Sequence, residues 1–248
     1  MSNNTKIPWA EASLNFATGC NKVSAGCANC YSLERTIPRL QAIGQKKYAN
    51  GTKFTVHEDA MYAPLKWKKG KRIFVNSVSD TFHAEMPNKI LDRFFSEVVA
   101  ETPHHTYLIL TKRPQNMEDY FLHHPDLLLP NVWLGVTAEN QEWADRRLPI
   151  LTQIDHRMRF VSVEPMLGPV DLSAYAGWLD WVIIGCESGP NRRPVPTGAI
   201  GALILQCKQM GVPVFLKQME IAGKVCSEPN IYIPELSPDL HQYLEYPE

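Results

Sequence analysis

The chain has 248 residues, of which 44% are hydrophobic and 21% are charged, the composition of an ordinary globular protein. No apolar run approaches the roughly 20 residues that a membrane-spanning helix needs, so we expect a soluble protein. The formal net charge of −1 provides no overall basic field, which argues against strong non-specific binding to nucleic acid. The amino-terminal residues carry no apolar signal segment, and the cytoplasm is therefore the expected location.

Short apolar runs rich in β-branched residues alternate along the chain with longer segments of helical character. The expected strands are residues 14–18, 72–75, 106–110, 132–136, 159–163, 181–184 and 214–216, and the expected helices are 30–43, 87–99, 140–151 and 198–210. Helical crossovers are what parallel strand pairing requires, and near-continuous apolar strands are typical of a sheet covered on both faces. The sequence therefore predicts an α/β fold, a partial or irregular TIM-like (β/α) barrel with about seven mainly parallel strands; a doubly wound open sheet is the alternative.

Two segments depart from this alternation within what we expect to be a single domain over residues 1–248. Residues 44–71 form an insertion long enough to act as a lid or a binding loop. At its end, the basic run 66–72 contains Trp67, which could stack on a base while the lysines meet phosphates; a solvated surface loop is the more common explanation for such a run. The tail, about residues 223–248, is expected to wrap the surface without adding to the core.

Three cysteines, Cys20, Cys27 and Cys30, follow the first expected strand in a Cys-x6-Cys-x2-Cys pattern. In a reducing compartment, clustered cysteines indicate metal binding more often than disulfides. Three protein ligands leave one coordination position open for chemistry. The residues alone allow an iron–sulfur cluster, or zinc with a fourth ligand such as His57 or His83. The distant Cys186 and Cys207 are expected to be buried apolar residues.

Polar residues follow six of the expected strands. Because the carboxyl ends of parallel strands share one rim, we expect these side chains to lie near the cysteine loop. Any one of them could instead cap a helix, and the charged ones could form a buried ion-pair network. The candidates are Asn76, Ser77, Asp80, Lys112, Arg113, Thr137, Glu139, Asn140, Ser162, Glu164, Glu187 and Lys217.

The cysteine loop TGCNKVSAGCANCY at 18–31 resembles that of the radical S-adenosylmethionine superfamily, in which three cysteines ligate a 4Fe-4S cluster and S-adenosylmethionine chelates the fourth iron. The chain is more specifically similar to a phage and bacterial family named for a three-cysteine motif. The segments that carry this similarity are LTKRP at 110–114, WLGV at 133–136, SVEPMLGP at 162–169, GCESGP at 185–190 and FLKQ at 215–218. The superfamily's usual first spacing is shorter, three residues, and its common aromatic residue is replaced here by Asn29, so Tyr31 is the candidate for the adenine contact.

The resemblance implies an enzyme that forms a 5′-deoxyadenosyl radical from S-adenosylmethionine, with the 4Fe-4S cluster on the three cysteines. It places Tyr31, the polar residues from Asn76 to Asn140 and Ser162 among the cofactor contacts, and Glu164, Glu187 and Lys217 on the substrate side. A nucleotide or nucleic-acid base is the expected substrate class, with an electron donor as partner and the host cytoplasm as location if the chain is phage-encoded. The alternatives are a zinc-stabilised nucleic-acid-binding or interaction protein, and a barrel that keeps a cluster without radical chemistry.

Overall fold

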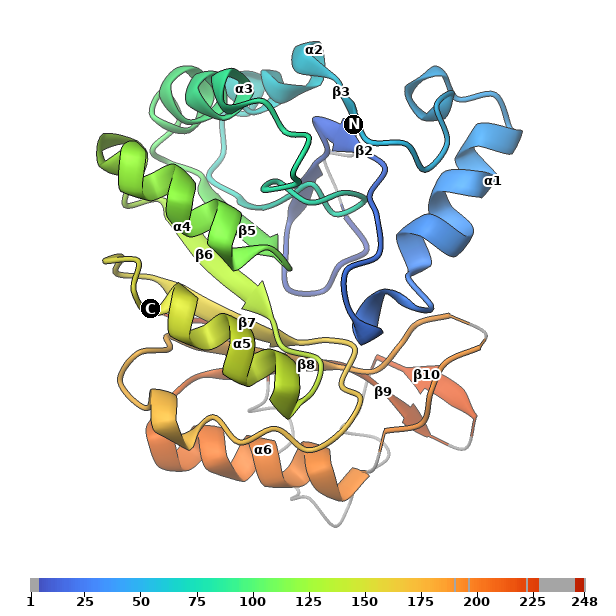
Figure 1. The fold of residues 1–248 in the computed structure, drawn as a ribbon, viewed down its shortest axis with the longest axis vertical. Coiled ribbons are helices and arrows are strands. Elements are labelled where there is room, and N and C mark those ends of the chain that lie inside the picture. Colours follow the sequence, from blue (N-terminus) through green and yellow to red (C-terminus); the bar gives the residue numbers. More distant parts are fainter. Residues whose placement is uncertain (1–4, 190, 196, 222, 228–243, 248) are drawn as a thin grey trace.

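The computed structural model describes residues 5–189, 191–195, 197–221, 223–227 and 244–247, and Figure 1 shows an α/β fold built on one large sheet. The sheet has eight strands in the order β1-β4-β5-β6-β7-β8-β9-β10. All neighbours from β1 to β9 are parallel, and β10 pairs with β9 in the antiparallel sense. The strands are β1 Ala12–Leu14, β4 Arg72–Val75, β5 Thr106–Thr111, β6 Val132–Thr137, β7 Arg159–Val163, β8 Trp181–Gly185, β9 Val214–Ile221 and β10 Lys224–Cys226.

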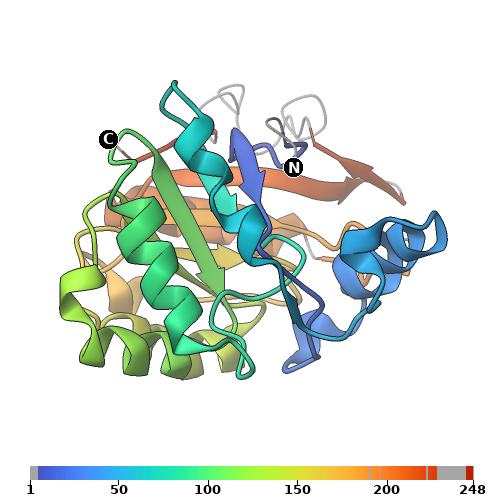
Figure 2. The same cartoon turned by 90° about the horizontal axis from the view of Figure 1, so that it is seen from above.

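The sheet curls into a half-barrel and does not close. Among the described residues its two edges, β1 and β10, pair with no further strand, so the predicted partial barrel is confirmed in its coarse form. Four helices follow strands β4, β5, β6 and β8 and run along the outer side of the curl (Figures 1 and 2). They are α3 Asn88–Arg93, which continues as a π-helix over Phe94–Val99, α4 Pro114–His123, α5 Gln141–Leu151 and α6 Thr197–Met210.

Most of the remaining elements lie before β4. The predicted strand at 14–18 is replaced by β1 and by a separate pair, β2 Ala17–Thr18 with β3 Thr55–Val56. The predicted helix at 30–43 is present as a π-helix over Ser32–Thr36 and α1 Ile37–Ala42. The insertion 44–71 contains β3, α2 Glu58–Met61 and two short 3-10 helices, Lys46–Tyr48 and Ala63–Lys66. Further 3-10 turns occur at Ala25–Cys27, Pro125–Leu127 and Ser173–Tyr175.

Alternate residues of each strand face opposite sides of the sheet and build two cores. Residues such as Ile109, Val136 and Val182 face outward and pack with the helices. The inner face carries Phe74, Leu108, Trp133, Phe160, Trp181 and Phe215, which fill the curl near the amino ends of the strands. Gly135 is required beside this layer, since a Cβ there would lie 2.4 Å from the Phe160 ring.

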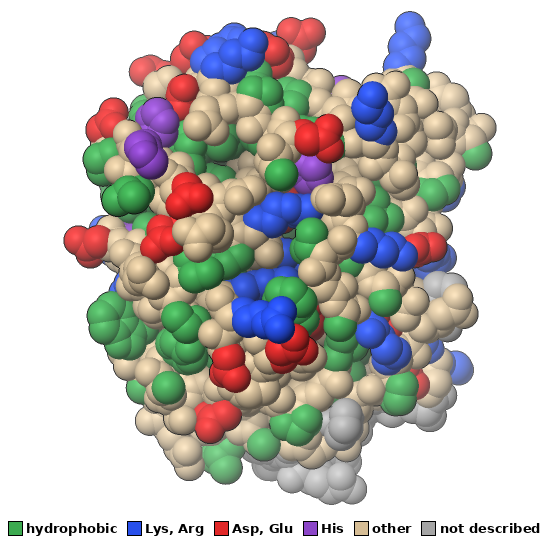
Figure 3. All heavy atoms as spheres, viewed as in Figure 1, with side chains coloured by type: hydrophobic (Ala, Val, Ile, Leu, Met, Phe, Trp, Pro, Cys, Tyr) green, Lys and Arg blue, Asp and Glu red, His purple; other side chains and the backbone are tan. Residues whose placement is uncertain are grey.

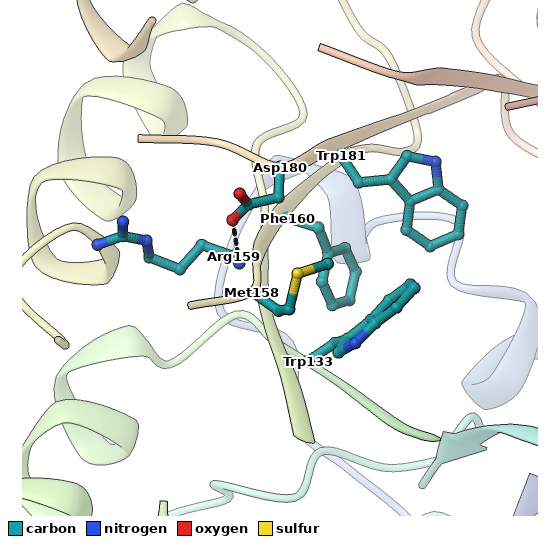
Figure 4. A pocket seen from close by; sticks show the side chains of 6 residues that line it. All are labelled: Trp133, Met158, Arg159, Phe160, Asp180 and Trp181. Atoms are coloured by element: carbon teal, nitrogen blue, oxygen red, sulfur yellow. Dashed lines mark hydrogen bonds between the residues drawn. The ribbon is translucent and has the colours of Figure 1, made fainter. Parts of the chain in front are cut away.

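Figure 4 shows the amino ends of β7 and β8, where the rings of Trp133, Phe160 and Trp181 lie together. Arg159 points away from these rings, and its backbone N–H donates to the Asp180 carboxylate at 2.7 Å. The pocket drawn there has no room for a water molecule. This end of the half-barrel is therefore a packed core.

The predicted tail lies mostly outside the described residues, which omit 228–243. Its end, residues 244–247, returns to the aromatic layer, where Tyr246 packs on Trp181 and Phe215. The Trp181 indole donates to the Glu245 carbonyl at 2.8 Å. Across the described part of the chain, no helix combines the length and apolar character needed to cross a membrane.

Candidate functional site

The cysteine loop, residues 20–30, crosses the carboxyl ends of the strands. Gly19 turns the chain into this loop with a φ of +79°, and a Cβ at this position would lie 2.2 Å from the Lys53 carbonyl oxygen, so only glycine fits. The Gly26 N–H donates to Glu139 Oε1 at 3.0 Å, just beyond β6, and Asn29 Nδ2 donates to Glu187 Oε2 at 3.1 Å, just beyond β8. The predicted meeting of the cysteine loop with the strand-end polar residues is therefore present for these two contacts.

The three cysteines are free thiols on this loop. Cys27 is buried, while Cys20 and Cys30 are partly exposed. The Cys27 N–H donates to the Ser24 carbonyl and the Cys30 N–H to the Cys27 carbonyl, which places Cys27 and Cys30 in consecutive tight turns. Both terminal nitrogens of Arg113 lie 3.8 Å from Cys20 Sγ. Burial raises the pKa of the Cys20 thiol to about 11, although Arg113 acts in the opposite direction.

Three thiols beside cations have the right chemistry for a metal or an iron–sulfur cluster. Their sulfurs are not gathered into a finished site: in the described part of the chain, no group of three or more His, Cys, Asp or Glu is arranged to hold a metal ion. The other cysteines match expectation, since Cys186 and Cys207 are both buried.

The two histidines considered as a fourth zinc ligand are engaged elsewhere. His57 Nε2 lies 2.8 Å from Thr18 Oγ1. The Nδ1 atom of His83 accepts the Glu85 N–H at 3.1 Å, so Nε2 carries the hydrogen and donates to Asn21 Oδ1 at 2.8 Å. Burial lowers the pKa of both rings and favours their neutral forms.

Asp80 organises one side of the loop. Its carboxylate accepts from Thr111 Oγ1 at 2.7 Å, from the backbone of Phe82 and Lys112, and from Arg113 NH1 at 2.7 Å. Arg113 also donates to the backbone and side-chain oxygens of Asn21. Asp80 is thus an anchor that aims the Arg113 guanidinium at Cys20.

Glu139 organises the other side, where it is fully buried. Arg147 NH1 donates to Glu139 Oε2 at 2.8 Å and to the Thr137 carbonyl at 2.7 Å, and its guanidinium stacks 4.1 Å from the Trp143 ring centroid. Lys112 Nζ lies 3.8 Å from the same carboxylate oxygen. Burial lowers the pKa of Lys112 and Arg147 acts in the same direction, while the Glu139 carboxylate acts to raise it.

The three predicted substrate-side residues are also ion-paired. Lys217 pairs with Glu164, and Arg193 Nε donates to Glu187 Oε1 at 3.2 Å. Arg193 additionally donates to the Ala25 carbonyl at 2.8 Å, which gives the cysteine loop a further attachment. Strand alternation places Lys217 and Glu164 on the inner face with Ser162, whose buried hydroxyl has no hydrogen-bond partner among the described residues.

Pairing of charges around this rim leaves one surplus cation. Of the described carboxylates here, Asp80, Glu139, Glu164 and Glu187 each have a close cation, namely Arg113, Arg147, Lys217 and Arg193. Lys112 is the additional one: its side chain is 20% exposed, and its Nζ shares the Glu139 carboxylate with Arg147. Figure 3 shows Lys and Arg side chains gathered in the middle of this face with acidic side chains beside them.

The remaining candidates divide by what their side chains contact. Asn140 caps α5 by accepting the Trp143 N–H at 3.1 Å. Asn76 accepts the Ala17 N–H and donates to Thr81, and the Ser77 hydroxyl donates to Asn15 at 3.1 Å. Tyr31 donates to the Ser77 carbonyl, with its ring 39% exposed next to Cys30, and Thr137 is buried.

Four residues that hold this site are not in the sequence prediction: Asn21, Asn29, Arg147 and Arg193. Asn21 and Asn29 are neighbours of cysteines, and that position was an available signal. Arg147 lies inside α5 and Arg193 in the loop after β8. Neither position follows a strand directly, so the rim argument could not select them.

A cavity of about 420 Å³ lies between the segment after β4 and helices α3 and α4. His83, Asn116, Asp119 and His123 contribute its polar lining. His83 connects this cavity to the loop through its hydrogen bond with Asn21.

Comparison with known proteins places the chain in a family. No curated protein matches the chain, and no solved structure does. One family, described as a protein of unknown function (DUF5131), matches residues 4–228, which is most of the sequence. The chain, with its cysteine loop and every strand of the half-barrel inside the matched range, therefore belongs to the DUF5131 family.

Proposed function

We propose that this protein is an enzyme that binds a 4Fe-4S cluster through Cys20, Cys27 and Cys30 and uses S-adenosylmethionine for radical chemistry on a nucleotide or nucleic-acid base. The observation that carries the proposal is the attachment of the cysteine loop to Glu139 and Glu187 across the carboxyl ends of parallel strands. This is the rim at which barrel enzymes build their sites. One-electron reductive cleavage of the sulfonium, giving a carbon radical, is the chemistry that the bound group supplies.

The cations at the rim suit a negatively charged ligand set. Three thiolates brought together repel one another, and a cation beside each of them reduces that repulsion. Arg113 lies against Cys20, and Lys112 lies beside Glu139, the carboxylate that accepts the Gly26 N–H of the same loop. Because Lys112 shares the Glu139 carboxylate with the closer Arg147, its charge can also serve the ligand set or the carboxylate of S-adenosylmethionine.

The inner face of the half-barrel supplies the groups that would orient substrate. The Ser162 hydroxyl can both donate and accept, and it has no partner in the described structure. Glu164 and Lys217 lie farther along the same face as a bonded pair, able to take or give a proton at Glu164 Oε1. The aromatic layer below them closes the other end and keeps water out.

Some of the candidate cofactor contacts already use their side-chain polar groups within the protein, and the others are the better candidates. Asp80 and Asn140 serve the protein itself, as an anchor for Arg113 and as a helix cap. Tyr31, Lys112, Thr137 and Ser162 remain as the group most able to touch S-adenosylmethionine. Among them, the exposed ring of Tyr31 beside Cys30 is the candidate for the adenine contact.

Anaerobic reconstitution with iron and sulfide tests this proposal. We expect a brown protein whose reduced cluster gives an electron paramagnetic resonance signal that changes when S-adenosylmethionine is added, and 5′-deoxyadenosine after reduction. Cys27→Ala should abolish cluster loading, whereas Cys207→Ala, a buried cysteine in α6 away from the loop, should retain it.

Equal loss of iron in the two variants would contradict the ligand assignment. A colourless protein that retains zinc would instead support the zinc-stabilised binding protein. If the electron paramagnetic resonance signal of the cluster does not change when S-adenosylmethionine is added, the protein holds a cluster but does not use it for radical chemistry.

A further inference from the structure

The charge of this protein is unevenly distributed. Residues 20–53, here called the basic lobe, contain six Lys and Arg and one Glu, a net charge of +5, whereas the whole chain has a net charge of −1. The rest of the chain therefore carries −6. Such a separation provides a local field that the overall charge conceals.

We propose that the basic lobe binds the backbone of a single-stranded nucleic acid and thereby presents a base to the cysteine loop. The inference takes its substrate class from the proposed function. It specifies that the substrate is a nucleic-acid strand and not a free nucleotide. The site differs from the one described above, because it uses the outer surface of residues 31–53 in addition to the loop itself.

The cations of the lobe are accessible. The π-helix Ser32–Thr36, α1 and the 3-10 helix Lys46–Tyr48 project to one side of the half-barrel in both views (Figures 1 and 2). Five of the six cations are exposed: Lys22, Arg35, Arg39, Lys46 and Lys53. Within the described chain, only Lys22 among these forms an ion pair, with Glu34 at 2.6 Å. Four exposed charges thus remain available for phosphates.

The lobe is continuous with the proposed reactive site. Cys30 is followed directly by Tyr31, whose ring is 39% exposed while its hydroxyl is held by the Ser77 carbonyl. An aromatic side chain that is held at its hydroxyl and partly exposed is suited to stacking a base, and base stacking on aromatic side chains tolerates any sequence. A strand bound along Arg35 and Arg39 would reach Tyr31 at the edge of the cysteine loop.

A single strand fits this surface better than a duplex. The basic lobe is small, and the remaining net charge of −6 would repel phosphates beyond it. A base in a single strand also reaches a recessed group without the cost of leaving a stack.

The other basic run, 66–72, does not suit the role. It immediately precedes β4 and lies at the amino ends of the strands, while the cysteine loop crosses their carboxyl ends. Trp67 packs against the main core with Lys71 5.5 Å from its ring centroid. Trp67 is therefore partly buried against the core, and its exposed neighbours Lys66, Lys68 and Lys69 make a matched control.

Fluorescence anisotropy with labelled single-stranded DNA and RNA oligonucleotides tests the proposal. For Arg35→Gln/Arg39→Gln/Lys46→Gln we expect affinity to fall tenfold or more at low salt. Each phosphate that no longer meets a cation should reduce the slope of log affinity against log salt by about 0.7, so the slope should fall by about 2. Lys66→Gln/Lys68→Gln/Lys69→Gln removes the same charge and should leave both quantities unchanged.

Equal reductions in the two triple variants would overturn the proposal, as would no detectable binding by the unaltered chain. Competition by polyglutamate at the same charge concentration as effectively as by the oligonucleotide would indicate an acidic protein partner and would also overturn it. Stronger binding to duplex than to single strands would do the same. These binding measurements use neither reductant nor S-adenosylmethionine. Their result therefore does not depend on whether the protein performs radical chemistry.

Discussion

The two ends of the half-barrel are built from the same strands and carry opposite chemistry. At the amino ends, the inner face is a layer of aromatic and aliphatic side chains, and the pocket between Trp133, Phe160 and Trp181 has no space for water. Toward the carboxyl ends, the same face presents Ser162, Glu164 and Lys217 beneath the cysteine loop. Every second residue of each strand points to the inner face, and the type of these residues changes from apolar at the amino end to polar at the carboxyl end. The apolar end maintains the curvature of the sheet, and the polar end is available for chemistry.

Because of this difference, we expect the two ends of the half-barrel to respond differently to substitution. Removing a ring from the packed end leaves a cavity, whereas removing one member of a buried ion pair leaves an unsatisfied charge. The packed end should therefore govern stability at every pH, and the polar end should add a pH-dependent part.

The largest expected effect is at the packed end. Trp181 is fully buried, contacts Trp9, Trp133 and Phe160, and donates its indole N–H. We expect Trp181→Ala to lower the free energy of unfolding by about 3–5 kcal/mol in urea denaturation. Trp178→Ala, at a tryptophan that is 50% exposed, should cost less than about 1 kcal/mol. Similar costs for both would show that the aromatic layer does not hold the curl.

At the polar end, Glu139→Gln should have the next largest effect. The substitution leaves Arg147 and Lys112 without their carboxylate, and breaking a buried pair costs about 3–5 kcal/mol at most sites of this kind, somewhat less here because Lys112 reaches solvent. It also weakens the acceptor of the Gly26 N–H and should loosen the cysteine loop. Lys112→Met is the matched change: it removes the surplus cation while Arg147 stays paired. We expect less than about 1 kcal/mol for Lys112→Met, and an equal cost would refute the assignment of Lys112 as surplus.

Glu139 also predicts a pH dependence. Burial acts to raise the pKa of this carboxyl, but Lys112 and Arg147 outweigh it, so the pKa in the folded protein is lowered. A lowered pKa contributes stability that is present above the unfolded-state value of about 4.3 and is lost as pH falls through the folded-state value. Denaturation below about pH 4.3 should therefore show a smaller acid loss in Glu139→Gln than in the unaltered chain. Parallel curves for the two proteins would contradict this assignment.

The sequence predicted the strands of the sheet better than the segments before β4. Continuous apolar runs such as Trp181–Gly185 need no tertiary information, since both faces of a parallel strand are covered. Helix α4 was not predicted, although Met117, Tyr120 and Phe121 have helical spacing and Pro114 occupies the first turn. Pro149 lies inside α5 and removes one backbone donor, yet the helix continues to Leu151, as predicted from the sequence.

The rim of polar residues was predicted from strand ends alone, and the contacts of Gly26 with Glu139 and of Asn29 with Glu187 agree with it. What the sequence could not provide was each residue's partner. Arg147 comes from the middle of a helix and Arg193 from a loop, so their pairing with Glu139 and Glu187 depends on three-dimensional proximity. The same limit left capping and cofactor contact undecided for Asn140.

Asn140 gives the smallest expected effect and the sharpest distinction between those two roles. Its side-chain oxygen accepts the Trp143 N–H at 3.1 Å, so Asn140→Ala should lower the free energy of unfolding by about 1 kcal/mol through loss of the cap. Asn140→Asp keeps an acceptor at the helix start and should restore that stability. If capping is its whole role, affinity for S-adenosylmethionine, measured by calorimetry on the reconstituted protein, should be the same in all three proteins. A loss of affinity in Asn140→Ala that Asn140→Asp does not recover would instead make Asn140 a cofactor contact, because only the amide N–H₂ distinguishes the two side chains.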